Sequence, residues 1–206
     1  MDKIDELASA LARFPGIGPR QGKRFVYYLL SVPAAERAKL AELIASLGKD
    51  VRQCAECMRF YNGTTAAVCN YCSDARRDDA LLMLIEKDQD LAAVERAGTY
   101  KGRYFVLGGV LTLTGKGAIR EKELLRLITK RLSSPEQGEP LLKEVVLALS
   151  ATSEGEHTAD RIRELLMPHR DHLKISVLGR GLATGSELEY SDAETLRAAL
   201  TNRKEA

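Results

Sequence analysis

The four cysteines of the chain form two pairs, and each pair has the spacing of a metal-binding turn: Cys54-x-x-Cys57 and Cys69-x-x-Cys72. Two intervening residues let both thiolates of a pair reach one ion. Two such pairs complete a tetrahedral shell of sulfur ligands, which suits Zn²⁺. A closed shell leaves no open coordination position, so the pattern predicts one structural zinc ion per chain that stabilises a short segment.

Two other uses of these cysteines are open at this point. A redox dithiol normally occurs as a single pair at the start of a helix, which two matched pairs do not resemble. An iron–sulfur cluster takes the same thiolate ligands, so ligand type alone does not exclude it. The spacing favours zinc.

A second candidate site is the turn Pro15-Gly16-Ile17-Gly18-Pro19, which separates two amphipathic segments. Gly16 and Gly18 allow a tight turn that brings backbone N–H groups against a ligand. A helix starting at Pro19 would add partial positive charge, which favours a phosphate. The turn is surrounded by cations: Arg13, Arg20, Lys23 and Arg24. We expect it to bind DNA through the backbone phosphates; the alternative is a plain helix connection with solvated charges.

Acidic residues follow two of the predicted strands: Glu86, Asp88 and Asp90 in one place, Glu154 and Glu156 in the other. The simplest interpretation is that carboxylates oppose the dipoles of helix N-termini, because a two-metal site needs more acids in register. The three histidines, His157, His169 and His172, have no metal-ligand partner at a persuasive spacing. No GxxxxGK[ST] phosphate loop occurs, which argues against an ATPase.

Apolar periodicity predicts where these residues lie. Helices are expected over 4–14, 19–30, 34–50, 88–98, 121–132, 154–167 and 192–201, and strands over 81–85, 104–107, 145–149 and 175–178. Ser153 and Ser191 have capping-box spacing to a glutamate and are expected to cap helices. Strands that alternate with helices indicate an α/β fold with a mostly parallel sheet.

The chain therefore divides into four predicted parts. Residues 1–52 form a helical DNA-binding module, 53–78 the four-cysteine zinc motif, 79–178 an α/β domain, and 179–206 a C-terminal segment with a helix. Ser133–Pro140 is expected to be a long surface loop.

Composition limits the class of protein. A hydrophobic fraction of 45% is ordinary for a globular chain, and a net charge of +2 means that DNA binding must come from local clusters. The acidic start Met1–Glu6 does not resemble a secretory signal, and no apolar run approaches the roughly 20 residues of a membrane helix. We expect the protein to be cytoplasmic, and the reducing cytosol disfavours disulfides.

Several motifs in this order resemble the RecR family of bacterial recombination mediators. The hairpin Phe14–Arg20 precedes the double CxxC. Gly102–Leu107 resembles the family's second-strand motif, and Glu154–Glu156 resembles its third-strand loop motif. The segment GLATGSELEYSDAETL over 181–196 resembles its C-terminal signature. The resemblance implies a helix-hairpin-helix module, a zinc motif and a Toprim domain. It also implies homodimers or ring-like tetramers that act with RecO, and often RecF, to help RecA displace single-strand-binding protein.

The resemblance also assigns residues. The family's basic DNA-contacting positions fall on Arg20, usually a lysine, and Arg24, and a RecO docking edge is implied at Glu86, Glu154 and Glu156. The chain departs from the family in the loop 108–115, which lacks the usual Ser-Pro step, and at Ala183 and Ser186, where proline and glycine are usual.

Catalytic Toprim domains bind Mg²⁺ through a glutamate and an Asp-x-Asp pair. Glu86 matches the glutamate, but Ser150 and Thr152 stand where the pair should be, and hydroxyls are poor ligands for a hard cation. We expect no enzymatic activity. Two alternatives are a Mg²⁺-dependent Toprim nuclease or primase-like enzyme and a purely structural zinc-binding oligomer without DNA affinity.

Overall fold

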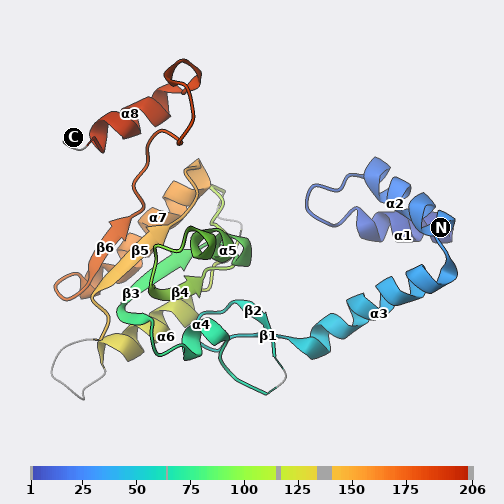
Figure 1. Ribbon diagram of the computed structural model, residues 1–206, viewed down its shortest axis with the longest axis horizontal. Coiled ribbons are helices and arrows are strands. Elements are labelled where there is room, and N and C mark those ends of the chain that lie inside the picture. Colours follow the sequence, from blue (N-terminus) through green and yellow to red (C-terminus); the bar gives the residue numbers. More distant parts are fainter. Residues whose placement is uncertain (1, 64, 115–116, 134–140, 204–206) are drawn as a thin grey trace. The chain divides into compact units, whose positions relative to one another are not determined.

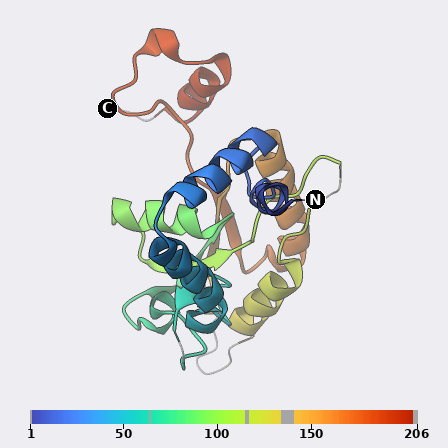
Figure 2. The ribbon, with the colours of Figure 1, turned by 90° about the vertical axis from the view of Figure 1, so that its right-hand side faces the viewer.

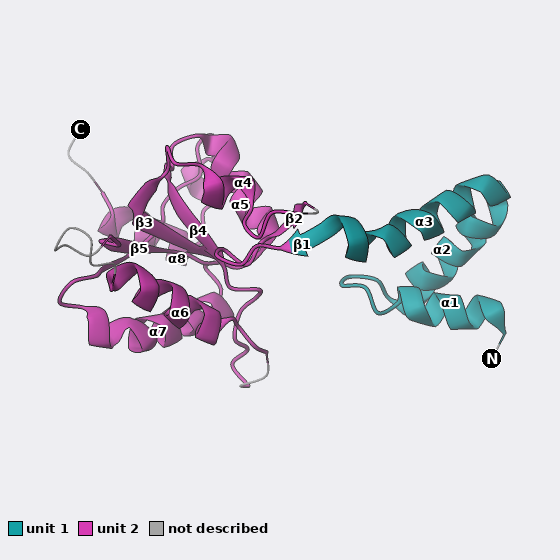
Figure 3. Cartoon of the chain, turned by 90° about the horizontal axis from the view of Figure 1, so that it is seen from below, with its two compact units in different colours: residues 1–52 teal, residues 53–206 magenta. Residues whose placement is uncertain are grey.

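The computed structural model describes residues 2–63, 65–114, 117–133 and 141–203. The chain divides into two compact units, Met1–Arg52 and Gln53–Ala206 (Figure 3). Residues 134–140 of the predicted surface loop lie outside the described residues. So does residue 115, the last residue of the loop that departs from the family.

The first unit consists of three helices, α1 (Lys3–Leu11), α2 (Pro19–Ser31) and α3 (Ala34–Asp50) (Figure 1). Helices α1 and α2 pack together and bury Ala8 and Val26. Their backbones approach closely at Gly22, where an added Cβ would lie only 2.5 Å from the carbonyl oxygen of Ala8. Helix α3 buries none of its side chains.

The first helix is shorter than its apolar pattern predicts, because it ends at Leu11 and not at Phe14. The amide of Phe14 donates to the carbonyl of Leu11 in a turn, and the Phe14 ring is exposed. A residue that precedes proline is disfavoured in the α-helical region. Pro15 therefore ends the helix although the apolar spacing continues.

The second unit is built on a parallel sheet with strand order β4-β3-β5-β6. Its strands are β3 (Asp78–Ile85), β4 (Gly102–Val106), β5 (Glu144–Ala148) and β6 (Lys174–Val177). The continuous apolar run of β3 is typical of a strand that is covered on both faces, and β3 lies in the interior of the sheet. The predicted α/β class and the parallel sheet are confirmed.

Helices cover the two faces of this sheet separately (Figures 2 and 3). Helices α6 (Glu121–Leu132) and α7 (Ser153–Leu166) share one core with Leu82, Leu84 and Phe105 of the strands. Helix α5 (Asp88–Ala97) packs through Leu91 on the opposite face, in a smaller core around Met83 and other side chains of β3 and β4. Because β3 and β5 pair in parallel, their carboxyl ends lie at the same edge of the sheet. Ligands commonly bind at this edge in such sheets.

The remaining elements are small or C-terminal: β1 (Val51–Gln53), β2 (Phe60–Asn62), α4 (Asn70–Ser73), the 3₁₀ turns Met167–His169 and Leu188–Tyr190, and α8 (Ala193–Thr201). Strands β1 and β2 form a two-stranded sheet. Within the described ranges, no helix is long and apolar enough to cross a membrane.

Two predicted helix caps were displaced by one residue. Thr152, not Ser153, caps α7, and its hydroxyl accepts a hydrogen bond from the amide of Gly155 at 3.1 Å. Asp192, not Ser191, caps α8 through the amides of residues 194 and 195. Thr and Asp are both good caps because each presents an oxygen to the free amides of the first turn.

The close approach at Gly22 predicts that Gly22→Ala destabilises the pairing of α1 and α2. Overpacking against a backbone oxygen should cost about 1–3 kcal/mol. Hydrogen exchange of the α1 and α2 amides measures the loss. Gly48→Ala is the matched control, since nothing lies within 4 Å of a Cβ at that helical position. Exchange no faster in Gly22→Ala than in the control would contradict the packing described.

Candidate functional site

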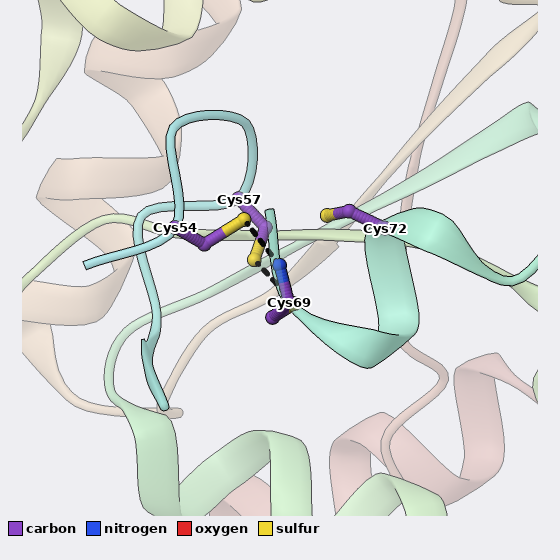
Figure 4. Close-up of side chains that lie close together, drawn as sticks. All are labelled: Cys54, Cys57, Cys69 and Cys72. Atoms are coloured by element: carbon purple, nitrogen blue, oxygen red, sulfur yellow. Dashed lines mark hydrogen bonds between the residues drawn. The ribbon is translucent and has the colours of Figure 1, made fainter. Parts of the chain in front are cut away.

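The structure brings the four predicted cysteines together into one cluster (Figure 4). Their sulfur atoms all lie within 4.8 Å of one another, and those of Cys57 and Cys69 are 3.5 Å apart. Cys54, Cys57 and Cys69 are almost fully buried, and Cys72 is half-buried. A tetrahedral ion with Zn–S bonds of about 2.3 Å requires sulfurs roughly 3.8 Å apart, so the donor set fits one ion in a closed shell.

Short strands and a short helix position the four cysteine side chains. The strands β1 and β2 flank the first pair, and the turn is closed by bonds from the amide of Cys54 to the carbonyl of Arg59 and from the amide of Met58 to the carbonyl of Cys54. Cys69 precedes the single-turn helix α4, which carries Cys72. The amide of Cys69 donates to the sulfur of Cys54 at 3.3 Å, as it would to a thiolate.

The crowding couples the ionisation of the four groups. The contact with Cys57 lowers the pKa of the Cys54 thiol, and the contact with Cys54 raises the pKa of Cys57. Four thiolates at this spacing repel one another unless a cation lies between them, and thiolates, not thiols, are the metal ligands. The cluster can therefore bind a metal ion. Within the described residues, it is the one group of three or more His, Cys, Asp or Glu side chains close enough to do so.

The glycine turn lies between α1 and α2, as predicted. Gly16 has φ +77°, a left-handed conformation that favours glycine. Gly18 is the N-cap of α2 and has no side chain to accept from the first-turn amides, and Pro19 occupies the first turn. That turn contains no acidic residue, so the positive end of α2 is open to an anion.

The four predicted cations of the hairpin are all exposed: Arg13, Arg20, Lys23 and Arg24. They are not equally available. Lys23 Nζ lies 2.9 Å from Asp5 of α1, whose hydrogen bond and charge raise the pKa of the lysine. Arg24 donates a hydrogen bond to the neutral Gln21, and within the described residues it forms no ion pair. The sequence around the turn does not reveal this acidic partner, because Asp5 reaches Lys23 only through the pairing of α1 with α2.

Glu86, at the carboxyl edge of the sheet, binds the backbone. Glu86 is 8% exposed, and its Oε1 accepts from the amide of Ser150 at 2.6 Å. The hydroxyls of Ser150 and Thr152 contact each other at 3.0 Å, and Thr152 caps α7. These two side chains are neutral, so Glu86 has no second carboxylate at positions 150 and 152.

The other acidic residues singled out in the sequence each have a different partner or position. Glu156 forms an ion pair with Arg180, whereas Glu154 is half-buried at the start of α7. Asp90 accepts from the amide of Lys87, and Asp88 from the amide of Phe60 in the cysteine segment. Among the histidines, His157 and His172 are exposed and His169 is half-buried. None belongs to a metal-ligand group within the described residues.

Sequence reasoning missed three residues that shape these sites. Gly22 allows α1 and α2 to approach, and an isolated glycine inside a helical pattern was the available signal. Arg103 and Arg120 reach the cysteine turns from the sheet and from the start of α6. Arg103 directly precedes the predicted strand 104–107, within the Gly102–Leu107 motif; nothing local marks Arg120.

Comparison with known proteins agrees with this architecture. Residues 4–47 match the family model "RecR, helix-hairpin-helix", residues 80–179 the Toprim domain, and residues 181–204 "RecR, C-terminal". Recombination protein RecR of Carboxydothermus hydrogenoformans is 37% identical over 203 residues, which cover 98% of this chain and 96% of that protein. The chain belongs to the RecR family.

Other RecR proteins are similarly close. That of Cereibacter sphaeroides is 38% identical over 201 residues, covering 98% of this chain and 96% of that protein. That of Myxococcus xanthus is 36% identical over 207 residues, covering 99% and 98%. The similarity supports a role in recombination, and the family resemblance drawn from the motifs is confirmed.

The cluster predicts that this RecR-family protein binds one metal ion per chain and that Cys72→Ser removes most of it. Mass spectrometry of the native protein and elemental analysis measure the stoichiometry. Ser73→Ala, at the neighbouring exposed position, should retain the ion. Acidification should release metal from the wild type, because protons compete for the thiolates. A metal-free wild-type protein, or a fully loaded Cys72→Ser variant, would contradict the assignment.

Proposed function

We propose that this chain is a non-catalytic, DNA-binding mediator of recombinational repair. In this proposal it acts with RecO, and with RecF, to load RecA on gapped DNA or on DNA coated by single-strand-binding protein. The observation that carries the proposal is the open, cationic N-terminus of α2, which follows the Gly16–Gly18 turn in a helix-hairpin-helix module of the RecR family.

The hairpin has the chemistry for gripping a phosphate backbone. The free amides at the start of α2 and its helix dipole favour an anion, and Arg20 and Arg24 add exposed guanidiniums on the same helix. Lys23 contributes less charge because Asp5 compensates it. Contacts of this kind position DNA without reading its sequence, which suits a protein that must act at any gap.

The carboxyl edge of the sheet supports a role without catalysis. Metal-assisted phosphoryl chemistry needs several carboxylates around Mg²⁺. Here Ser150 and Thr152 carry hydroxyls, and the one buried carboxylate, Glu86, holds the amide of Ser150. The edge is thus suited to fixing the turn between β5 and α7.

We assign the ion of the cysteine cluster to Zn²⁺ in a structural role. The residues Cys54, Cys57, Cys69 and Cys72 supply all four ligands of a closed tetrahedral shell, which leaves no position for a substrate. Bound zinc would stabilise a segment that has few apolar side chains of its own. A colourless protein without visible absorption distinguishes zinc from an iron–sulfur cluster.

Exposed surfaces support assembly and partner binding in the cytoplasm. Helix α3 presents a run of apolar side chains that are 43–61% exposed: Leu40, Leu43, Ile44 and Leu47. Large exposed apolar patches mark interaction sites, and we assign this one to the homodimer or tetramer ring of the family. Glu154 and Glu156 are the half-buried acids of the proposed RecO docking edge, and Glu86, the third, is buried.

The proposal predicts that reversing two hairpin charges strongly weakens DNA binding. An Arg20→Glu, Arg24→Glu variant should bind a labelled gapped duplex at least tenfold more weakly than the wild type, measured by fluorescence anisotropy at moderate salt. Each lost phosphate contact removes a counterion-release term. Lys122→Glu, Arg126→Glu is the matched control, because both residues are exposed on α6 and the change in net charge is the same.

Equal binding by the two double variants would contradict the hairpin assignment. If the wild type binds DNA only after RecO is added, the same comparison is made with RecO present. A wild type that binds in neither condition would favour the purely structural zinc oligomer.

The proposal also predicts no nuclease or primer-synthesis activity with Mg²⁺ or Mn²⁺. Wild type and Glu86→Gln are compared on gapped and single-stranded DNA under both metals. Indistinguishable, background-level product is expected because the carboxylates needed around the metal are absent. Metal-dependent product that Glu86→Gln abolishes would establish the enzymatic alternative.

A further inference from the structure

Two arginines outside the cysteine segment reach into it and hold its backbone. Arg103 lies in β4, an edge strand of the large sheet, and Arg120 is the N-cap residue of α6. Each guanidinium donates to backbone carbonyls of a different cysteine turn. The two turns are therefore tied to the same sheet independently of any ion.

Arg103 holds the second turn. It is 7% exposed, and its Nη1 donates to the carbonyls of Tyr71 at 2.8 Å and Cys72 at 2.9 Å. Its Nε donates to Asp79 Oδ1 at 2.7 Å, which fixes the plane of the guanidinium. The last carbonyls of a helix have no partner within that helix, so Arg103 satisfies the end of α4 and fixes the direction of the Cys72 side chain.

Arg120 holds the first turn. Its Nη1 donates to the carbonyl of Met58 at 3.1 Å and to that of Val106, in β4, at 2.9 Å. The amide of Val106 donates in turn to the carbonyl of Cys57 at 2.9 Å. Gly108 leaves room for the guanidinium, since a Cβ there would lie 3.1 Å from Arg120 Cζ.

The first turn needs this support because Met58 has φ +61°, a left-handed conformation that costs free energy for any residue except glycine. The carbonyl of Met58 also accepts from Gln53 Nε2 at 3.0 Å. The strained residue directly follows Cys57, and the surrounding donors hold it in the conformation that turns the Cys57 sulfur toward the cluster.

We propose that Arg103 and Arg120 are positioning residues of the metal centre. They hold the two cysteine turns at the separation that one ion requires. They also place positive charge beside a site whose four thiolates exceed the charge of a divalent cation. Residues that orient metal ligands from behind typically contribute 10–100-fold to metal affinity. The inference rests on the proposed zinc site and is independent of DNA binding.

The test measures Zn²⁺ affinity in the full-length protein by competition with a chromophoric chelator. Arg103→Gln and Arg120→Gln should each bind Zn²⁺ about 10–100-fold more weakly than the wild type. Arg126→Gln, an exposed position on α6, is the control and should bind as the wild type does. Arg103→Lys should fall between wild type and Arg103→Gln, because lysine keeps the charge but not the forked donors.

A second readout separates positioning from general stabilisation. Co²⁺ in place of Zn²⁺ reports ligand geometry through its visible d–d bands, which should change in Arg103→Gln and Arg120→Gln but not in Arg126→Gln. Where a glutamine variant does not fold, Arg103→Lys is measured in its place.

Unchanged Zn²⁺ affinity and unchanged Co²⁺ bands in the arginine variants would overturn the inference and leave the zinc site intact. A wild-type protein that takes no Zn²⁺ from the chelator would instead overturn the zinc site itself.

Discussion

Four sulfur atoms within 4.8 Å of one another are the constraint around which one edge of the second unit is built. As thiolates they repel one another, and a cation bound between them would relieve that repulsion. The turns are fastened to β4 by backbone and arginine hydrogen bonds, and to α5 through Asp88. The metal motif is therefore part of the Toprim unit's packing and not a separate appendage.

The distribution of charged and hydroxyl side chains over the chain supports the proposal of a protein that binds DNA without catalysis. The carboxyl edge of the sheet has a buried glutamate that accepts from a backbone amide and two hydroxyls that contact each other. Positive charge is placed instead on the first unit, at the start of α2. In the proposed function, the second unit would supply docking surfaces and the first unit would supply contacts to phosphate.

Sequence determined the features that depend on residues close together in the chain. The double CxxC spacing, the Gly16–Gly18 turn and the alternation of apolar strands and helices were each sufficient to predict a local structure that was then observed. It could not give features that arise when distant segments meet. The pairing of Lys23 with Asp5, the contact of Gly22 with Ala8, and the reach of Arg120 to Met58 all depend on tertiary packing. The observed ends of some helices differ from the predicted ones because Pro15 and the capping side-chain oxygens, and not apolar periodicity, determine where those helices end or begin.

The central claim is that the hairpin grips DNA phosphates, and the salt dependence of binding tests it most directly. The slope of log Kobs against log salt concentration counts the phosphate contacts, at about 0.9 per contact on duplex DNA and about 0.7 on single strands. If Arg20 and Arg24 each contact one phosphate, a variant with both replaced by glutamine should have a slope shallower by about 1.4–1.8. A variant with weaker binding but an unchanged slope would contradict the account.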